Sequence, residues 1–223
     1  MQPLNLFTYF FTKDHFTVLR WVCVVIVLSI GTIGSAFAKE AQEKVKLDAV
    51  VKDFTLKDAE GTDFTLYKLS EKKQVTVVLF LATQCPIATD YTDRIVNLVK
   101  AYDAKKVQFI GINSNKQEKI AEILAYSQKH GFEFPVLKDR ENKIADYFGA
   151  RRTPEVFLLD AKRVLRYAGA IDNSRKEPTK HYLKDALDLV IAGKDIPKPS
   201  KKTRAIGCTI KRVRKTGVND RTP

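Results

Sequence analysis

Cys85, followed by Pro86, is the residue of this sequence with the clearest chemical potential. Residues 75–82 before it form a continuous apolar and β-branched run, which predicts a strand buried on both faces. From residue 87 to residue 102, apolar residues recur every three or four positions, as on one face of a helix. Cys85 is therefore expected where a central strand ends and a helix begins.

This position favours a reactive thiolate at Cys85. Free N–H groups and partial positive charge at the start of a helix lower the pKa of a cysteine there, and the thiolate is the nucleophilic form. Pro86 is compatible with the first helical turn because its missing N–H would have no partner there. The alternative interpretation is a buried structural cysteine.

A second feature is Thr153-Pro154, which directly precedes the predicted strand 155–160. Proline at the start of a strand cannot donate to the ladder. Cis peptide bonds are largely confined to bonds before proline. We therefore expect a cis bond at Thr153-Pro154 that faces Cys85 across the edge of the sheet. The alternative is an ordinary edge proline.

The chain contains two cysteines besides Cys85, namely Cys23 and Cys208. Cys23 lies in the apolar N-terminal run and is lost if that run is cleaved. In an oxidising compartment, a redox pair, one structural disulfide and two independent thiols are all compatible with Cys85 and Cys208. The sequence leaves this choice open.

The N-terminus predicts export. Residues 21–37 form a nearly unbroken apolar run, which is preceded by Lys13 and Arg20 and ends in the small residues around Ala38. This pattern is typical of a signal peptide over residues 1–38. The alternative is an uncleaved membrane anchor, because a run of about 17 residues is just long enough to span a bilayer. Either way, we expect a periplasmic or extracellular protein.

The basic charge of the chain is concentrated at its C-terminus. The formal net charge is +13, and the last 26 residues contain nine Lys and Arg residues against one acid, Asp220. The region before them is only mildly basic. For an exported protein, this distribution favours an anionic membrane or cell-wall surface over nucleic acid as a partner of the tail.

The order of predicted elements indicates an α/β domain over residues 51–193. It is preceded by a linker, 39–50, and followed by a basic tail, 194–223. The predicted elements are a hairpin within 53–66, strands at 75–82 and 107–113, a helix from 86 to 102, a helix from 120 to 131, an extended piece at 134–137, a helix at 142–148, a hairpin of 155–160 and 164–168, and a helix at 182–191. The strand–helix–strand unit implies parallel strands.

The segment from Phe80 to Ala88 resembles the active-site strand and turn of the thioredoxin superfamily, and Thr153-Pro154 resembles its cis-proline loop. The resemblance spans about Val51 to Gly193 and implies a thioredoxin-like fold, with a central mixed β-sheet flanked by helices and an N-terminal hairpin. More narrowly, five segments resemble the peroxiredoxin-like redoxins of the alkyl hydroperoxide reductase/thiol-specific antioxidant group: Cys85-Pro86 with Tyr91, Gly111–Asn115, Ala150–Asp160, Gly169–Asn173 and Gly207–Lys211.

The sequence departs from these families at several positions. Ala88 stands where thioredoxins have their second cysteine, and Arg212 stands where related redoxins have an aromatic residue. Thr83 corresponds to the threonine that precedes the peroxiredoxin cysteine, at a slightly altered spacing. The position of the arginine that polarises peroxide falls on Pro154. Arg151 and Arg152 lie just before Pro154 and are candidates to supply positive charge to the thiolate, with exposed surface charge as the alternative.

The resemblance implies a thiol-dependent oxidoreductase with antioxidant activity. Its candidate site residues are Thr83, Cys85, Pro86, Arg152, Thr153 and Pro154, with Cys208 as the candidate resolving thiol. The expected substrate is a peroxide or a protein disulfide, and the expected reductant is a thiol that the sequence does not identify. Only one cysteine is expected to attack.

No cofactor or metal is expected. The three histidines share no metal-ligand spacing with one another or with Cys85, and the sequence contains no glycine-rich phosphate loop. The competing hypothesis is a redox-inactive thioredoxin-fold scaffold or binding module at the cell envelope. The two hypotheses differ in one property, because the enzyme needs a low thiol pKa at Cys85.

Overall fold

The structure is a computed structural model that describes residues 43–102 and 106–214. Residues 1–42, 103–105 and 215–223 lie outside the described part, and the predicted signal peptide or anchor lies among them. The chain divides into two units, 1–41 and 42–223, and the fold below is that of the second. Within the described residues, no helix combines the length and the apolar character that a membrane span requires.

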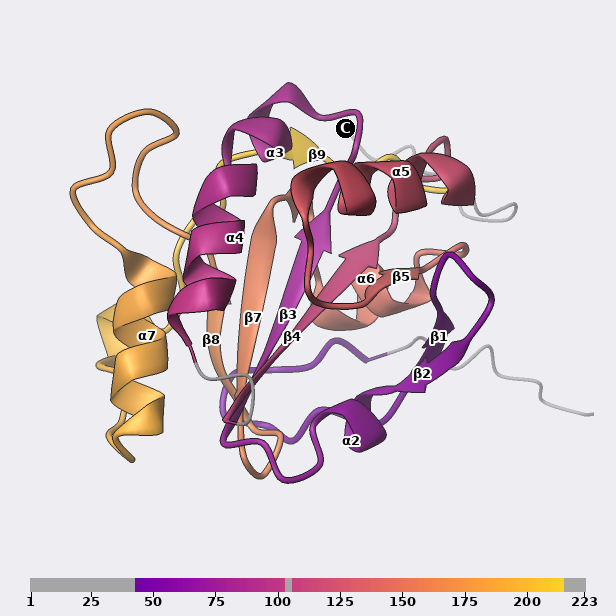
Figure 1. The fold of residues 1–223 in the computed structure, drawn as a ribbon. Helices are drawn as coiled ribbons and strands as arrows, with labels where there is room; N and C mark the ends of the chain where they lie inside the picture. Colours follow the sequence, from indigo (N-terminus) through magenta and orange to yellow (C-terminus); the bar gives the residue numbers. More distant parts are fainter. Residues whose placement is uncertain (1–42, 103–105, 215–223) are drawn as a thin grey trace, which may run out of the picture. The chain divides into compact units, whose positions relative to one another are not determined.

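A mixed sheet of seven strands forms the centre of the domain, in the order β2-β1-β5-β4-β3-β7-β8 (Figure 1). The strands are β1 (Thr55–Lys57), β2 (Asp63–Thr65), β3 (Val75–Leu81), β4 (Val107–Asn113), β5 (Val136–Lys138), β7 (Glu155–Asp160) and β8 (Leu165–Gly169). β3, β4 and β5 are parallel neighbours, and β1, β7 and β8 each run antiparallel to the strand beside them. The predicted parallel unit and both hairpins are confirmed.

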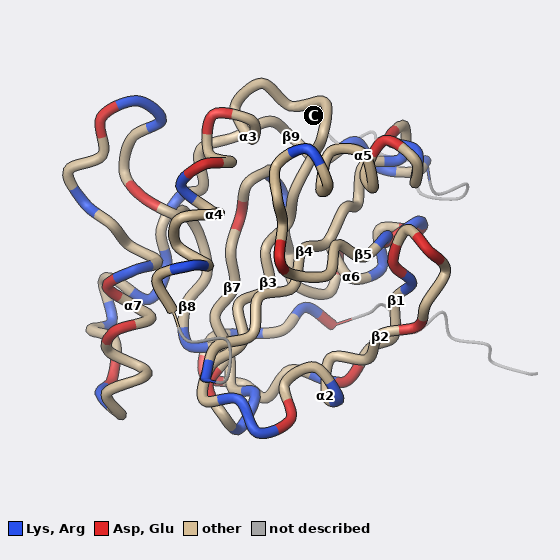
Figure 2. Tube along the Cα trace, in the orientation of Figure 1, with Lys and Arg blue, Asp and Glu red and all other residues tan. Residues whose placement is uncertain are grey.

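The side chains of β3 alternate between two cores because successive residues of a strand point to opposite faces. Val77 and Leu79 pack in one core, and Val78 and Phe80 pack in the other. All seven residues of β3 are buried. Figure 2 shows β3 and β4 without charged residues, while Lys, Arg, Asp and Glu lie on the surrounding helices and loops. The strand that leads to Cys85 is therefore held from both sides.

Helices cover both faces of the sheet. They are α2 (Leu66–Leu69), α3 (Pro86–Asp90), α4 (Thr92–Ala101), α5 (Ile120–His130), α6 (Lys143–Phe148), α7 (Tyr182–Ile191) and a short 3-10 turn, η1 (Lys198–Ser200). α4 and α7 pack Ile95 and Leu187 onto the face of Val77, whereas α6 packs Phe148 onto the face of Phe80. In Figure 1, α4 and α7 lie side by side at the left, next to β7 and β8. α5 and α6 end at Gly131 and Gly149, both left-handed, as predicted.

The helix predicted after Pro86 is interrupted. α3 ends at Asp90 and α4 begins at Thr92, so that Tyr91 caps both helices. Tyr91 is 1% exposed, and its hydroxyl donates a hydrogen bond of 2.9 Å to Asp172. The break therefore coincides with the residue that anchors the start of the helix to the loop after β8.

The segment after the last helix does not extend freely from the domain. The described part of the predicted basic tail, 194–214, folds back and buries Ile196, Ala205 and Ile210. Cys208–Thr209 forms strand β9, which pairs antiparallel with β6 (Arg152–Thr153). The sequence interpretation gave weight to the charges of this segment and overlooked its apolar residues.

Residues before the domain also pack against it. The amide of Val45 donates to the carbonyl of Tyr147, and that of Asp48 donates to Leu165, each at 2.8 Å. The described part of the predicted linker, 43–50, therefore contributes contacts to the same unit. The boundaries 39–50, 51–193 and 194–223 remain predictions of domain organisation.

Candidate functional site

Cys85 lies where the sequence predicted it, just after β3 and at the N-cap of α3. Its side chain is 4% exposed, and its sulfur accepts a hydrogen bond from the amide of Ala88 at 3.3 Å. Pro86 occupies the first turn of the helix, as expected. The Ala88 amide stabilises negative charge on the Cys85 sulfur, whereas burial opposes it.

Cys85 and Cys208 are joined by a disulfide, with their Cα atoms 6.1 Å apart and a separation of 123 positions in sequence. The sequence left this pairing open, and the structure brings the two sulfurs together. Thr153 completes the group, because its carbonyl oxygen lies 3.6 Å from the Cys85 sulfur and its backbone pairs with Cys208. The Thr153-Pro154 bond is cis, which confirms the prediction.

Gly207 allows β9 to approach Thr153 closely. A Cβ atom at position 207 would lie 2.1 Å from the carbonyl oxygen of Thr153, far inside van der Waals contact. Residues with a side chain are therefore excluded unless the backbone moves. The residue before Cys208 thus determines whether Cys208 reaches the end of β6.

The structure directs Thr83 and Arg152 to partners other than the Cys85 sulfur. The hydroxyl of Thr83 donates to Glu118 at 2.9 Å, and the guanidinium of Arg152 donates to the carbonyl of Gly207 at 2.9 Å. Among the described residues, neither side chain has a hydrogen bond to Cys85. Arg152 therefore stabilises the segment that carries Cys208, and its predicted role beside the thiolate has no contact to support it here.

Glu118 is the site residue that the sequence interpretation missed. It is 2% exposed and lies beneath the turn that precedes Cys85. Its carboxylate accepts hydrogen bonds from the amide and hydroxyl of Thr83 at 2.7 and 2.9 Å and from the amide of Gln84 at 3.3 Å. The side-chain amides of Asn113 and Asn115 donate at 2.5 and 2.7 Å. One buried carboxylate therefore binds the Cys85 turn to the end of β4.

The amino group of Lys138 completes this network. It donates to the side chain of Asn113 at 2.8 Å and to the carbonyls of Asn115 and Glu118 at 2.6 and 2.9 Å. Burial lowers the pKa of Lys138 from its ordinary 10.5, and the charge of Glu118 opposes this effect. Burial alone would raise the pKa of Glu118, but the hydrogen bonds from Thr83, Asn113 and Asn115 hold it below 4.5. Glu118 is therefore ionised at neutral pH.

Asn115 extends the network to the segment that carries Cys208. Its side-chain oxygen accepts a hydrogen bond from the amide of Lys211 at 2.7 Å, and the amide of Lys116 donates to the carbonyl of Lys211 at 2.9 Å. The turn before Cys85 and the residues after Cys208 are thus bound to one buried polar cluster. The sequence offered one clue, since Asn115 belongs to a segment that resembles redoxins.

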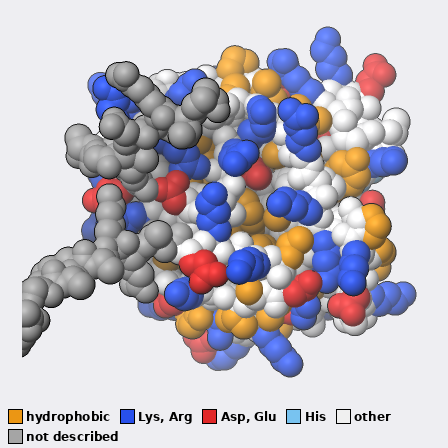
Figure 3. Space-filling view, turned by 180° about the vertical axis from the view of Figure 1, so that it is seen from behind, with side chains coloured by type: hydrophobic (Ala, Val, Ile, Leu, Met, Phe, Trp, Pro, Cys, Tyr) orange, Lys and Arg blue, Asp and Glu red, His pale blue; other side chains and the backbone are white. Residues whose placement is uncertain are grey.

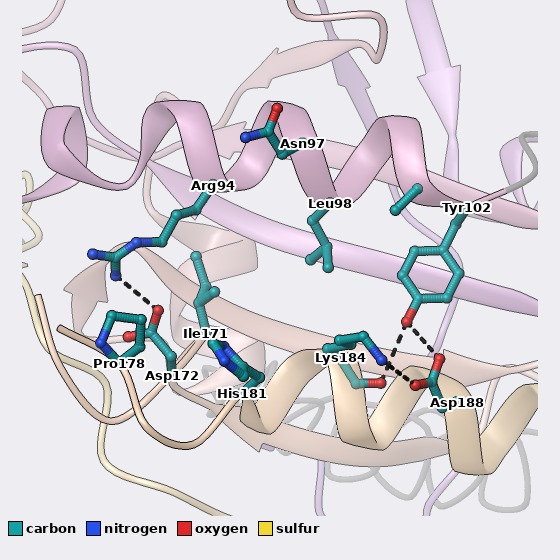
Figure 4. Close-up of a pocket in the computed structure, with 11 residues that line it drawn as sticks. Arg94, Asn97, Leu98, Tyr102, Ile171, Asp172, Pro178, His181, Lys184 and Asp188 are labelled. Carbon is teal, nitrogen blue, oxygen red and sulfur yellow. Dashed lines mark hydrogen bonds and ion pairs between the residues drawn. The ribbon is translucent and has the colours of Figure 1, made fainter. Parts of the chain in front are cut away.

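A separate cavity of about 510 Å³ lies between α4 and α7 (Figure 4). Its charged side chains are largely engaged with one another: Arg94 binds Asp172 at 2.8 Å, and Lys184 binds Asp188 at 2.7 Å. The hydroxyl of Tyr102 also donates to Asp188, at 2.6 Å. Cys85 does not line this cavity. Asp172, which lines this cavity, also accepts the hydroxyl of Tyr91.

Metal ligands do not gather in the part of the chain that the structure describes. Residues 43–102 and 106–214 contain no group of three or more His, Cys, Asp or Glu side chains placed to hold an ion.

Comparison with known proteins yields a family match and similar sequences. The profile of the AhpC/TSA family matches residues 47–168. Peroxiredoxin Q, chloroplastic, of Triticum aestivum is 28% identical over 145 residues, which are 62% of this chain and 64% of that protein. The chain therefore spans just under two thirds of the length of that relative. Thiol-disulfide oxidoreductase ResA of Halalkalibacterium halodurans (strain C-125) is 26% identical over 150 residues, 66% of this chain and 82% of ResA.

Solved structures also share the fold. A hypothetical protein of Sinorhizobium meliloti 1021 superposes with a TM-score of 0.70 at 30% identity, and the match covers 77% of this chain and 97% of that protein. The fold is thioredoxin-like, with a central mixed sheet flanked by helices, as predicted.

The buried network yields a prediction for Glu118→Gln. The variant should lower the free energy of unfolding by about 3 kcal/mol at pH 7, because the new amide accepts with one oxygen only and directs an NH₂ group at donors. The pKa of Glu118 is depressed in the folded state, so its stabilisation is complete above the unfolded pKa and is lost as pH falls through the folded value. Urea unfolding should therefore show a difference from wild type that shrinks below about pH 4.5.

Glu122→Gln is the matched control, because Glu122 is more exposed and accepts from the side chain of Gln84 at 2.8 Å. It should cost less than about 1 kcal/mol. Equal losses in the two variants, or a loss for Glu118→Gln that is independent of pH, would contradict the role assigned to the buried carboxylate.

The close approach at Gly207 yields a second prediction. Gly207→Ala should lower the equilibrium constant for Cys85–Cys208 disulfide formation about tenfold, because the backbone of β9 must move away from Thr153. Alkylation of free thiols after equilibration in a glutathione redox buffer measures this constant. Thr209→Ala, in the same strand with an exposed side chain, should stay within about twofold of wild type. An unchanged constant for Gly207→Ala would show that β9 does not position Cys208.

Proposed function

Since the chain belongs to the AhpC/TSA family, we propose that it is an exported thiol-dependent oxidoreductase in which Cys85 alone attacks the substrate and Cys208 is the resolving residue. The observation that carries the proposal is the Cys85–Cys208 disulfide, which is the oxidised form that such a reaction leaves behind. The substrate class that the site geometry favours is a disulfide of another protein.

The proposed reaction begins at the reduced site. The thiolate of Cys85 attacks a substrate disulfide, forms a mixed disulfide and releases one substrate thiolate. The thiolate of Cys208 then attacks the Cys85 sulfur, forms the Cys85–Cys208 disulfide and releases the second substrate thiolate. The substrate gains two electrons and the protein loses two. The amide of Ala88 stabilises Cys85 as a thiolate before the attack.

Thr153 and Pro154 complete the proposed site as positioning residues. The carbonyl of Thr153 lies beside the Cys85 sulfur, and its backbone is already engaged in a strand pair. Pro86 begins the helix that presents Cys85. These residues hold the two sulfurs and the approaching chain in register, which is the requirement for exchange between disulfides.

Peroxide reduction is the second candidate, and the family match favours it. In that reaction, the Cys85 thiolate would take one oxygen from the peroxide, and the resulting sulfenic acid would condense with the Cys208 thiol to give the same disulfide and water. The positions of Thr83 and Arg152 count against it, because both side chains are engaged by other partners. Disulfide exchange is therefore preferred.

The predicted signal peptide and the presence of a disulfide support an exported location, periplasmic or extracellular. We propose an anionic membrane or cell-wall surface as a partner of the basic C-terminal residues and no role for nucleic acid. The reductant is a thiol. The alternative is a scaffold that keeps the Cys85–Cys208 disulfide as a purely structural bond.

The proposal predicts different fates for three cysteine variants. The reduced full-length chain is mixed with one equivalent of a peptide disulfide, or separately with hydrogen peroxide, and its intact mass is followed. Wild type should lose two hydrogen atoms. Cys208→Ser should retain the peptide as a mixed disulfide on Cys85, because no second thiol displaces it. Cys85→Ser should not react at a comparable rate. Cys23→Ser is the matched control and should behave as wild type.

The rates distinguish the candidates. If disulfide exchange is the function, the peptide disulfide should oxidise the protein faster than hydrogen peroxide does. Hydrogen peroxide should then react with Cys85 no faster than it reacts with a small thiol at the same thiolate fraction. The opposite order would favour the peroxidase. If Cys85 reacts with neither reagent, the structural scaffold is the better explanation.

A further inference from the structure

A cavity of about 560 Å³ lies between the residues around β6 and the returning C-terminal segment. Arg151, Arg152 and Glu155 line it from the first side, and Arg204 and Arg212 line it from the second. Neither cysteine of the disulfide is among its lining residues, so the cavity is separate from the redox site. Its volume is within the range of small-molecule sites.

The structure balances some of the charges in this cavity. The guanidinium of Arg212 pairs with the carboxylate of Asp146, which does not line the cavity. Arg152 donates to the carbonyl of Gly207 at 2.9 Å, and because this acceptor is neutral, the positive charge of Arg152 remains. Glu155 is the single acid among the lining residues.

Arg151 and Arg204 are available to a ligand. Both residues are exposed, and neither side chain has a hydrogen bond or ion pair with any residue in 43–102 or 106–214. With the charge of Arg212 balanced, three guanidinium groups line the cavity against one carboxylate, which gives a net charge of +2. An anion with two negative charges would match this excess.

The backbone that carries both free side chains is fixed. The amide of Arg151 donates to the carboxylate of Glu155 at 2.6 Å, and its carbonyl accepts from the amide of Ile210 at 3.0 Å. Next to Arg204, the amide of Thr203 donates to a carbonyl of β8 at 3.0 Å. Two guanidinium groups from distant parts of the chain are thus held at one cavity, and ligand binding does not have to order their backbone.

We propose that this cavity binds a phosphomonoester, with Arg151 and Arg204 as its principal donors. A phosphomonoester has three acceptor oxygens and a charge of about −1.5 to −2 at pH 7, close to the charge that the cavity requires. A carboxylate has two oxygens in one plane, and a single guanidinium already engages both of them. Two guanidinium groups from separate segments therefore favour phosphate. The inference goes beyond the proposed function and does not depend on it.

The remaining wall leaves room for the organic part of the ester. It is formed by small side chains, Thr203, Ala205 and Thr209. Figure 3 shows Lys and Arg side chains spread across the face of the molecule seen from behind, and such a surface attracts anions. A free small ester and the headgroup of phosphatidic acid present the same phosphate group, and the experiment separates these two sources.

The test measures binding of glycerol 3-phosphate to the full-length chain by isothermal titration calorimetry at pH 8 and constant ionic strength. Dimethyl phosphate is the matched ligand control, because it is a diester with a single negative charge. The variant is Arg151→Gln combined with Arg204→Gln. Lys68→Gln combined with Lys129→Gln is the charge control, because both lysines are exposed and neither lines the cavity.

Wild type should bind glycerol 3-phosphate at least about tenfold more tightly than dimethyl phosphate. The arginine pair variant should lose about tenfold in affinity for glycerol 3-phosphate, and the lysine pair variant should stay within about twofold of wild type. Glu155→Gln should bind about threefold more tightly, because its amide oxygen still accepts from the backbone and the repelling charge is gone.

A second arm follows sedimentation of the protein with phosphatidylcholine vesicles that contain phosphatidic acid. A greater loss of vesicle binding in the arginine pair variant than in the lysine pair variant would identify the lipid headgroup as a source of the phosphate. Equal losses, together with binding of glycerol 3-phosphate as expected, would identify a free ester as the source.

The proposal would be overturned if wild type bound neither glycerol 3-phosphate nor, through the two arginines, the vesicles. It would also be overturned if dimethyl phosphate bound as tightly as glycerol 3-phosphate, or if the arginine and lysine pairs weakened its binding equally, since either result would indicate attraction to the overall charge alone. None of these outcomes would affect the proposed function, because neither sulfur belongs to this cavity.

Discussion

The carboxylate of Glu118 is the constraint on which the arrangement of the site depends. A buried ionised group is tolerated only when hydrogen bonds and opposite charge replace its lost hydration. Five donors from the Cys85 turn, the end of β4 and the loop before α5 meet this requirement, and Lys138 supplies the positive charge. The hydrogen bonds to the Glu118 carboxylate therefore fix the turn before Cys85, because breaking them would leave a buried charge without partners. The strand that leads to it is fixed by apolar packing on both faces.

The C-terminal segment is held by the same cluster and by the disulfide. β6 and β9 contain two residues each, and a ribbon of that size has little stability alone. Three further contacts hold it: the disulfide, the approach permitted by Gly207, and the hydrogen bonds between Asn115, Lys116 and Lys211. Reduction removes the covalent contact and leaves the others. The disulfide is thus one of several contacts that hold this segment to the domain.

The parts of the fold that local patterns determine were predictable from the sequence. Apolar runs predicted β3 and β4, and a glycine predicted the end of α5. A proline at the start of a predicted strand, considered together with Cys85, predicted the cis bond. The placement of Cys208 and the role of Glu118 were not predictable, because each arises between residues distant in sequence. Thr83 and Arg152 were correctly placed near the site, but their partners depend on Glu118 and Gly207, which no local pattern identifies. The apolar Ile210 within a basic segment was the overlooked signal.

The two sulfurs differ in environment, and this difference divides their roles. Cys85 is buried, follows the central strand and has a backbone donor for its negative charge, so it is suited both to attack and to leave. Cys208 lies on a two-residue strand and is partly exposed. The basic charge that the sequence concentrates in the last residues is partly brought back to the domain, where Lys201 binds Asp48 and Arg212 binds Asp146. The returning segment is therefore held to the domain by ion pairs, by its buried apolar residues and by the disulfide.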